Sequence, residues 1–383
     1  MAGVSDDELQ QGDDQLYEHF RFVADRGQGP LRVDKFLVDR IVGTSRNRIQ
    51  QAADGGFILV NGRPERSSYK VRPGDVVQVM MDRPRHTTEI LPEDIPLDIV
   101  YEDDDLLVVN KPAGMVVHPG HGNYSGTLVN ALAWHFQQQG IELDLTGSDD
   151  LAASADEADE ADDDTPRDSD TPRDADCKPD FQKRMGLVHR IDKETSGLLV
   201  IAKNEDAGTS LSRQFFHKTT RRLYLALVWG HVADDAGTIT GNIGRNRRDR
   251  TLMDFYPAGS DEGKPAVTHY RVIERLGYVT LVECRLETGR THQIRVHMKH
   301  AGHTLFNDHQ YGGDQILKGT TFARYSQFVR NCFAICPRQA LHAATLGFRH
   351  PRTGEEMDFE APLPEDMARL VEKWREYVSN RNY

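Results

Sequence analysis

The chain has 383 residues, an apolar fraction of 38% and a net charge of −13. This length predicts two or more domains, and no apolar run is long enough to span a bilayer. Four cysteines and an acidic N-terminus without a basic-then-apolar leader argue against a secreted disulfide scaffold and predict a cytoplasmic protein.

The first elements form a small basic unit. Residues 1–30 are polar and acidic and predict a disordered N-terminus. Apolar spacing predicts one helix from 31 to 41 and a second from 45 to 53. Asn61-Gly62 between two apolar runs predicts a hairpin with a tight turn, which a strand at 76–79 completes.

Residues 31–81 carry nine Lys or Arg and five acids. The predicted second helix and hairpin hold five of these cations: Arg46, Arg48, Arg63, Arg66 and Lys70. Clustered positive charge of this kind makes contacts with phosphates. The pattern resembles an S4 RNA-binding domain over nearly its full length, so we expect Arg46 and Arg48 to contact RNA. The alternative is a small basic domain with a solvated face.

A larger domain follows a linker. Residues 82–96 hold three prolines and mixed charge, which is typical of a linker, and the second domain extends over 97–383. Its first predicted strands cover 99–101 and 106–110, and helical spacing appears at 127–136.

An acidic segment interrupts this domain. Residues 141–180 hold sixteen Asp or Glu against three Lys or Arg, a balance that equals the net charge of the whole chain. Residues 140–182 have almost no large apolar side chains after Leu151, so they cannot bury enough surface to offset the entropy of ordering. We predict a disordered acidic insertion. Because the rest of the chain is balanced, the net charge does not argue against an RNA partner.

A polar turn between two apolar runs carries the most informative residues. Residues 185–188 enter this turn and residues 198–202 leave it, and between them stands His189-Arg190-Ile191-Asp192-Lys193-Glu194-Thr195-Ser196-Gly197. This order places Asp192 and Arg190 beside a sheet edge, on a loop held by two buried elements, where catalytic side chains are often mounted. Taken alone, Asp192 could equally serve only to shape the turn.

The string resembles the signature of the RluA family of RNA pseudouridine synthases, with Ile191 in place of the usual Leu. The resemblance implies that Asp192 is the catalytic residue and that Arg190 fills the gap left by a flipped uridine. It also implies that the segment Lys111-Pro112-Ala113-Gly114 borders the active cleft. We expect the neighbouring His189 to contact RNA.

A basic and aromatic run links a predicted helix at 204–217 to a predicted strand at 223–229. Its cations are expected to meet phosphates: Lys218, Arg221 and Arg222. From the residues alone, Tyr224 is a core tyrosine on an aliphatic strand. The resemblance implies instead that Tyr224 stacks on the target base, since a π-face suits a base pulled out of its stack.

Residues 288–297, Thr-Gly-Arg-Thr-His-Gln-Ile-Arg-Val-His, form the second strong motif. Helical spacing predicts a buried apolar stripe and an opposite face that presents cations: His292, Arg295 and Lys299. The resemblance implies that Arg295 pairs with Asp192, and an adjacent cation lowers the pKa of a carboxylate. We expect Arg290 and His292 to bind RNA. The alternative is a surface helix with salt bridges.

The remaining pattern predicts a hairpin over 266–286, a late strand at 341–348 and a closing helix at 364–377. Many strands with few helices and no βαβ rhythm predict an α+β fold with a mostly antiparallel sheet. The expected architecture is a small S4-type RNA-binding domain followed by a mixed-sheet pseudouridine synthase catalytic domain.

Metal and cofactor chemistry is not expected. His297, His300 and His303 drift around the helix and lack a completing carboxylate or cysteine, and Cys332, Cys336 and His342 are an equally weak signal. The sequence has no GxGxxG or phosphate-binding loop, so we expect no nucleotide cofactor.

The resemblance covers about residues 31–80 and 97–350 and is strongest to the RluD branch, which acts on large-subunit ribosomal RNA. It implies isomerisation of uridine to pseudouridine without a cofactor, with Asp192 as nucleophile or base. We expect the enzyme to act as a monomer. One alternative is a non-catalytic S4-domain RNA-binding or ribosome-assembly protein. Another is a metal hydrolase built on the cluster around His297.

Overall fold

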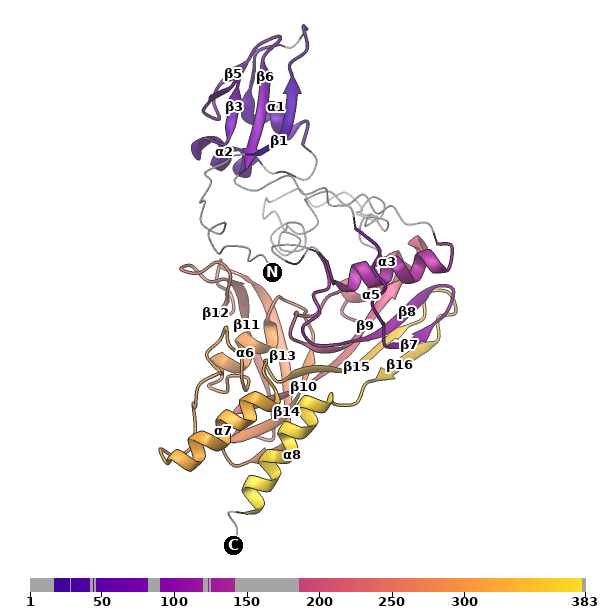
Figure 1. Ribbon diagram of the computed structural model, residues 1–383, viewed down its shortest axis with the longest axis vertical. Helices are drawn as coiled ribbons and strands as arrows, with labels where there is room; N and C mark the ends of the chain where they lie inside the picture. The colour runs from indigo at the N-terminus through magenta and orange to yellow at the C-terminus, as the bar shows by residue number, and fades with distance from the viewer. Residues whose placement is uncertain are drawn as a thin grey trace, which may run out of the picture. The chain divides into compact units, whose positions relative to one another are not determined.

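The computed structural model describes residues 17–27, 29–41, 44, 46–81, 90–119, 123, 125–141 and 186–380. Nearly all of the predicted acidic insertion at 140–182, and residues 1–16 of the predicted disordered N-terminus, lie outside these ranges. The described chain divides into two compact units, one within residues 17–81 and one within residues 90–380 (Figure 1). Each has its own hydrophobic core.

The N-terminal unit packs two short helices on a small antiparallel sheet. Its elements are β1 (Tyr17–Val23), β2 (Leu31–Arg32), α1 (Val33–Val38), α2 (Arg46–Asp54), β3 (Ile58–Val60), β4 (Arg63–Pro64), β5 (Lys70–Val71) and β6 (Val76–Met81). The strand order is β1-β6-β3-β4, and β2 pairs with β5. Phe36 and Leu37 of α1 and Ile49 of α2 share one core with Ile58 and Val77 of the sheet.

The predicted hairpin turn at Asn61-Gly62 is confirmed, whereas the predicted disorder at the first strand is not. Asn61 and Gly62 have φ angles of 52° and 79°, the left-handed pair that a two-residue turn between β3 and β4 requires. The predicted N-terminal disorder is wrong for residues 17–23, which form β1 and pair with β6. The charged Arg21 lies between Phe20 and Phe22 there, and these two rings pack against the core.

The C-terminal unit is built on a ten-stranded sheet. Its strands are β7 (Ile99–Glu102), β8 (Leu106–Lys111), β9 (Ser196–Ala202), β10 (Arg221–Trp229), β11 (Ala236–Arg245), β12 (Met253–Tyr256), β13 (Lys264–Leu276), β14 (Val279–Leu286), β15 (Leu341–Arg349) and β16 (Glu356–Glu360). Its helices are α3 (Leu128–Gln138), α5 (Glu205–Phe216), α6 (Gln293–His300), α7 (Ala323–Ile335) and α8 (Glu365–Ser379). The strand order is β12-β11-β13-β14-β10-β15-β9-β8-β7, with β16 beside β15.

This sheet confirms the predicted α+β class. Every pair of strands in it is antiparallel except β15 with β9. The predicted hairpin is β13 and β14, and Thr127 caps α3 through a capping box with Asn130. The strands β11, β12 and β16 and the helix α7 were not predicted.

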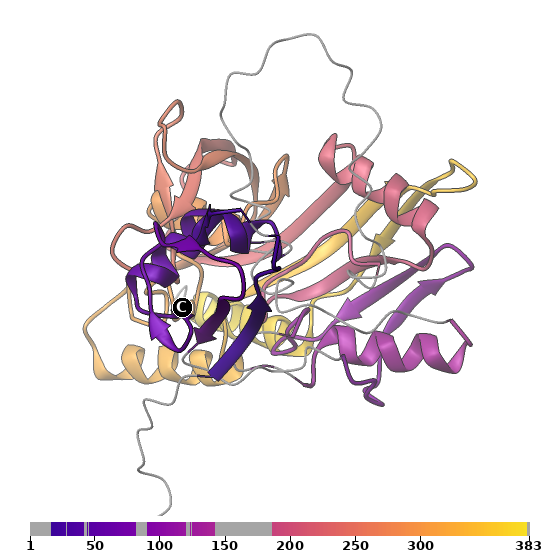
Figure 2. The ribbon, with the colours of Figure 1, turned by 90° about the horizontal axis from the view of Figure 1, so that it is seen from above.

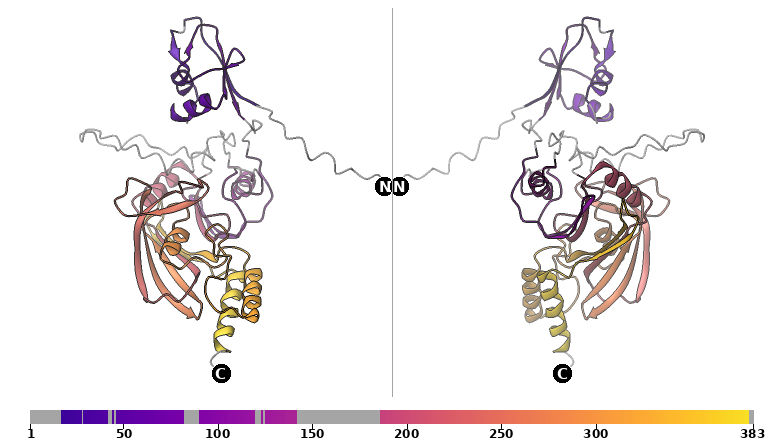
Figure 3. Two further views of the ribbon diagram at one scale, coloured as in Figure 1. Left: turned by 90° about the vertical axis from the view of Figure 1, so that its left-hand side faces the viewer. Right: turned by 90° about the vertical axis from the view of Figure 1, so that its right-hand side faces the viewer.

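Helices cover both faces of the sheet, and the two-residue period of the strands sorts side chains between them. On β10, Ala226 and Val228 face the core shared with α3 and α6, whereas Leu227 and Trp229 face α7 and α8. The helix α5 packs over β8 and β9 on the face opposite α3 (Figure 2). The helices α7 and α8 run side by side (Figure 3).

Among the described helices, none combines the length and apolar character that a membrane crossing requires.

Candidate active site

Asp192 lies on a loop that ends where β9 begins at Ser196. Gly197 is the last residue of the loop motif, and it pairs with Ala343 where β9 runs parallel to β15. A Cβ at Gly197 would stand 2.3 Å from the carbonyl oxygen of Ala343, and its φ of 119° also favours glycine. The close approach of these two strands therefore requires the glycine of the motif.

Two buried cations bind the backbone just after Asp192. The ammonium of Lys111, at the end of β8, donates to the carbonyl oxygen of Lys193 at 3.0 Å and to two carbonyl oxygens of its own loop. The guanidinium of Arg338 donates to the carbonyl oxygen of Glu194 at 2.9 Å. The segment that starts at Lys111 thus lies against the Asp192 loop, and the loop is held from both sides.

Arg295 of α6 joins two carboxylates. Its Nη1 donates to Oδ2 of Asp192 at 3.1 Å, while its Nε and Nη2 donate to the two oxygens of Asp308 at 2.7 and 2.8 Å. Nη2 also donates to Gln310. The Asp192 side chain keeps 22% of its surface exposed, whereas Asp308 is fully buried. The buried carboxylate fixes the guanidinium, and the guanidinium then holds the accessible carboxylate.

The predicted exposed cationic face of this helix is wrong for Arg295. Its side chain is 3% exposed, and residues 293–298 are all buried. Lys299 alone of the predicted cations on this face is exposed. The simple helical pattern fails because Asp308, from a later loop, provides a partner for a charge inside the unit.

The charges around Asp192 keep its carboxyl group ionised. Burial raises the pKa of Asp192, but the charges of His292 in its protonated form, of Arg295 and of Arg190 outweigh burial and hold the pKa below the ordinary value of 3.8. Burial also lowers the pKa of His292, so this ring is neutral at neutral pH and Arg295 provides the close charge. The site thus presents an ionised, partly exposed carboxylate to a bound ligand.

His292 stands beside the carboxylate in a left-handed conformation, with φ of 55°, just before α6. Its Nδ1 contacts the hydroxyl of Tyr311 at 2.8 Å, and that hydroxyl already accepts the N–H of Met253. The hydroxyl proton of Tyr311 is therefore available for Nδ1, which leaves the imidazole proton on Nε2. Nε2 lies 3.9 Å from Oδ2 of Asp192.

Tyr224 lies on β10, between Cys284 of β14 and Ala343 of β15. It is buried in the same cluster as Ile191, the residue before Asp192. Burial raises the pKa of Tyr224, so the hydroxyl stays protonated, and the charge of Asp192 acts in the same direction. The ring and the carboxylate therefore belong to one site.

The two residues at the start of the motif differ in their surroundings. Arg190 is exposed and adds to the positive charge around Asp192. The Nε2 of His189 instead accepts the backbone N–H of Val200 at 3.0 Å, and its ring stacks on Phe215 at 4.4 Å. Burial and a neighbouring arginine lower the pKa of His189 to about 3, so the ring is neutral. The imidazole ties the loop to β9.

The side chains of the basic run before Tyr224 differ in their exposure. Lys218 is exposed, in a left-handed conformation. Arg221 donates to Glu356 and Asp358, so its charge is already neutralised. These two carboxylates compete with any phosphate for the Arg221 guanidinium. Arg222 is buried, with its guanidinium 5.4 Å from the ring centre of Phe215. Arg290 donates to a backbone carbonyl of β13.

In the N-terminal unit, Arg46 begins α2 and pairs with Asp34 at 3.0 Å. Arg32 pairs with the same carboxylate, which is fully buried. Arg48, half-buried, lies on the same helix. Three cations of the predicted hairpin are exposed: Arg63, Arg66 and Lys70.

The histidines that resembled a metal cluster make other contacts. The Nδ1 of His297 contacts the hydroxyl of Thr268, the ring of His300 stacks on Phe255 and the Nδ1 of His303 contacts a backbone carbonyl. These three side chains are therefore parts of the packing around α6.

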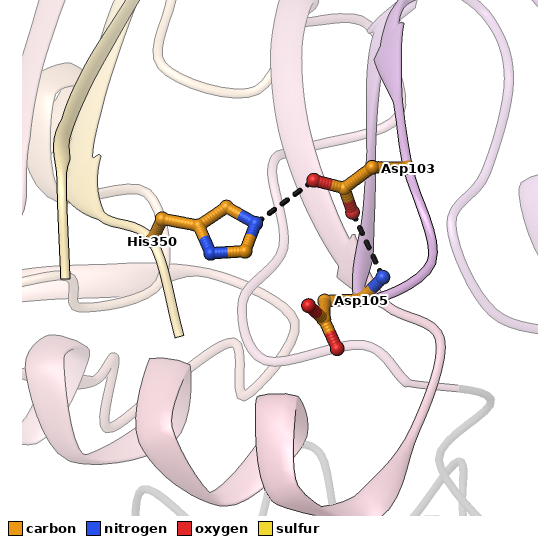
Figure 4. A group of neighbouring side chains, drawn as sticks. All are labelled: Asp103, Asp105 and His350. Carbon is orange, nitrogen blue, oxygen red and sulfur yellow. Dashed lines mark hydrogen bonds and ion pairs between the residues drawn. The ribbon is translucent and has the colours of Figure 1, made fainter. Parts of the chain in front are cut away.

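One group of three possible metal ligands is present among the residues that the structure describes: Asp103, Asp105 and His350 (Figure 4). Hydrogen-bond donors already occupy its carboxylates. His350 contacts Asp103 at 2.8 Å, and Asp103 also accepts a backbone N–H of Asp105 and the Tyr101 hydroxyl. Arg352 donates to Asp105 at 2.6 Å. The group joins the turn between β7 and β8 to the end of β15.

Asp308 is the main site residue that the sequence analysis missed. It lies in the polar stretch 307–310, between the apolar pair Leu305-Phe306 and Tyr311. This arrangement of a polar turn after an apolar run repeats the one around Asp192 and was the available signal.

Comparison with known proteins identifies the family. The RNA pseudouridylate synthase family model matches residues 105–300, and the S4 domain model matches residues 31–77. An uncharacterized RNA pseudouridine synthase of Chlorobaculum parvum is 43% identical over 91% of this chain and 95% of its own. A second from Bacillus subtilis, YlyB, is 43% identical over 92% and 97%. The ribosomal large subunit pseudouridine synthase D of Zymomonas mobilis is 39% identical over 92% and 95%.

The match extends through both units, and the sequence motifs that suggested the family lie together around one ionised carboxylate. The protein belongs to the family of RNA pseudouridine synthases, and it carries an S4 domain before its catalytic domain.

Proposed function

We propose that this enzyme converts specific uridines of large-subunit ribosomal RNA to pseudouridine, with Asp192 as the catalytic residue. The observation that carries the proposal is the Asp192 carboxylate, partly exposed and held at 3.1 Å by an arginine that a second carboxylate fixes. The relative from Zymomonas mobilis named ribosomal large subunit pseudouridine synthase D supports the choice of RNA.

The reaction is an isomerisation of one nucleotide. The bond between C1′ and N1 breaks, the uracil turns, C5 bonds to C1′, and the proton lost from C5 is balanced by one gained at N1. No electrons leave or enter, so the reaction needs no redox partner. Asp192, ionised by its surroundings, can act as a nucleophile or as a base. Arg295 supports the charge of the carboxylate, and Tyr224 offers the base a ring to stack on.

The RNA contacts in this proposal come from both units. In the catalytic domain, we expect contacts from Arg190 on the catalytic loop, from Lys218 before β10, and from Arg290 and His292 before α6. In the S4 domain, we expect them from Arg46 and Arg48 of the helix α2. We also propose that the enzyme acts as a monomer in the cytoplasm. The free thiols of Cys284, Cys332 and Cys336, all buried, agree with a reducing compartment.

The test is the substitution Asp192→Asn. Asn keeps the size of the side chain but can act neither as base nor as nucleophile, so we expect turnover to fall by at least about 10²-fold. RNA binding should change little. The measurement is pseudouridine formation in large-subunit RNA, with Asp234→Asn, at an exposed carboxylate between β10 and β11, as the control.

Mapping pseudouridines in RNA from cells without the protein identifies the target uridine. Normal turnover by the Asp192→Asn enzyme would contradict the catalytic role and favour a binding protein. An unchanged set of pseudouridines in large-subunit RNA, with sites lost from another RNA, would contradict only the choice of RNA.

A further inference from the structure

Arg222 is a buried cation for which none of the residues that the structure describes provides a counter-charge. Its residue surface is only 8% exposed, and its Nε has no hydrogen-bond partner in the structure. No oxygen of the described residues accepts a hydrogen bond from its guanidinium. A buried charge without a partner costs several kcal/mol, so an arginine that serves folding alone is normally paired. The contrast with Arg295, which two carboxylates bind, is direct.

A second hydrogen-bond donor without a partner among the described residues lies two residues before Arg222 in the chain. Thr220 is buried, and its hydroxyl has no hydrogen-bond partner. Thr220, Arg222 and Tyr224 are all buried at a spacing of two, whereas Arg221 between them is exposed. A hydroxyl and a guanidinium both donate hydrogen bonds, so the two unsatisfied groups call for the same kind of ligand, an anionic oxygen.

The described groups that contact the guanidinium are uncharged. The ring of Phe215 lies 5.4 Å away, and His189, whose pKa the charge of Arg222 helps to lower, is neutral. The backbone of Gly289 comes so close that a Cβ there would stand 2.9 Å from Nη1 of Arg222. A glycine at this position therefore leaves room for the guanidinium.

The location connects Arg222 to the reaction. It stands two residues before Tyr224 on β10, and its charge reaches the Tyr224 hydroxyl, as does that of Asp192. Gly289 belongs to the motif that also provides His292 and Arg295. An anion at Arg222 would thus lie next to the nucleotide whose base meets Tyr224.

We propose that Arg222, assisted by Thr220, binds one phosphodiester of the RNA beside the target uridine, and that the free enzyme keeps this buried charge unpaired until RNA arrives. The inference rests on the proposed function, because it takes RNA as the ligand. The bidentate geometry of a guanidinium suits a phosphate, and burial makes each hydrogen bond stronger than at the surface.

The test compares neighbouring arginines. Arg222→Gln and Arg221→Gln each remove one positive charge, but Arg221 is 49% exposed and already paired with Glu356 and Asp358. We expect Arg222→Gln to weaken RNA binding about ten- to a hundredfold and to reduce the slope of log K against log salt by about one. Arg221→Gln should change neither value appreciably.

Two further measurements separate a phosphate contact from a structural role. Without RNA, the Tm of Arg222→Gln should equal or exceed that of the wild type, because an unpaired buried charge is removed. Replacing single phosphates beside the target uridine by neutral methylphosphonates should weaken binding to the wild type at one position, and have no effect there on Arg222→Gln.

A lower Tm together with unchanged RNA affinity would overturn the proposal, as would equal methylphosphonate effects in both proteins. The choice of large-subunit RNA is tested separately, by turnover of the wild type. The binding and Tm comparisons use any uridine-containing RNA that the wild type modifies, so they stand even if that RNA is not ribosomal.

Discussion

Arg295 shows how one residue organises this site. A guanidinium has donors on two edges, and Asp308 occupies the Nε–Nη2 edge in a bidentate pair. Only Nη1 then remains to reach Asp192. A lysine could not divide its charge in this way, because its ammonium has no fixed fork of donors. The fully buried Asp308 therefore determines where the carboxylate of Asp192 stands.

The substitution Asp308→Asn tests this positioning role. Without the second carboxylate, Arg295 loses its fixed orientation, so kcat should fall about tenfold or more while the Kd for RNA stays the same. The free energy of unfolding should also drop, by about 3 kcal/mol, since one partner of a buried pair is removed. Urea unfolding and single-turnover kinetics measure the two effects. A folded variant with normal kcat would show that Asp308 supports only the fold.

The pH dependence of the reaction follows from the lowered pKa of Asp192. A carboxyl group whose pKa is depressed is ionised above that pKa, so activity should persist as pH falls from neutral and decline only below about 3.8. Arg190→Gln removes an exposed charge that contributes to the depression, so the acid limb of kcat should move to higher pH. Circular dichroism over the same range separates this effect from acid unfolding. An acid limb that does not move would mean that Arg190 does not act on Asp192.

At the scale of elements, the sequence was most informative where burial and local signals agree. The helix at 127–136 has an apolar stripe and a threonine cap, and the structure places α3 there. The hairpin of β3 and β4 follows from Asn61-Gly62, because few residues accept positive φ. These elements are determined by nearby residues, so a single sequence reveals them.

The elements that were missed depend on distant partners. Strand β11 alternates Thr and Asn with Gly and Ile, and its register is determined by pairing with β13. Strand β1 has Phe20 and Phe22 on either side of the charged Arg21, and its pattern is explained only by the packing of these two rings against the folded core. The same limit applies to the site. The family motif revealed Asp192, but Asp308 becomes visible only when α6 packs against its loop.

At the scale of the whole molecule, the two units have separate hydrophobic cores. The core of the S4 domain consists of residues between 24 and 79, and the cores of the catalytic domain consist of residues from 90 onward. Burial of apolar surface is the main stabilising term in folding, so we expect each unit to fold without the other. We expect the two units to cooperate in RNA binding.

Deleting residues 1–85 tests this division. The remaining chain keeps all the residues of its own cores and should unfold cooperatively with an unchanged Tm. It should bind ribosomal RNA more weakly, with a shallower salt dependence, because the phosphate contacts of the S4 domain are lost. The full chain with Arg63, Arg66 and Lys70 changed to Gln is the matched control, since all three are exposed and lie outside the core. It should show part of the same loss in slope without loss of the fold. A salt slope that neither variant changes would mean that the S4 domain makes no ionic contact with the RNA, and the catalytic domain would then have to bind its substrate alone.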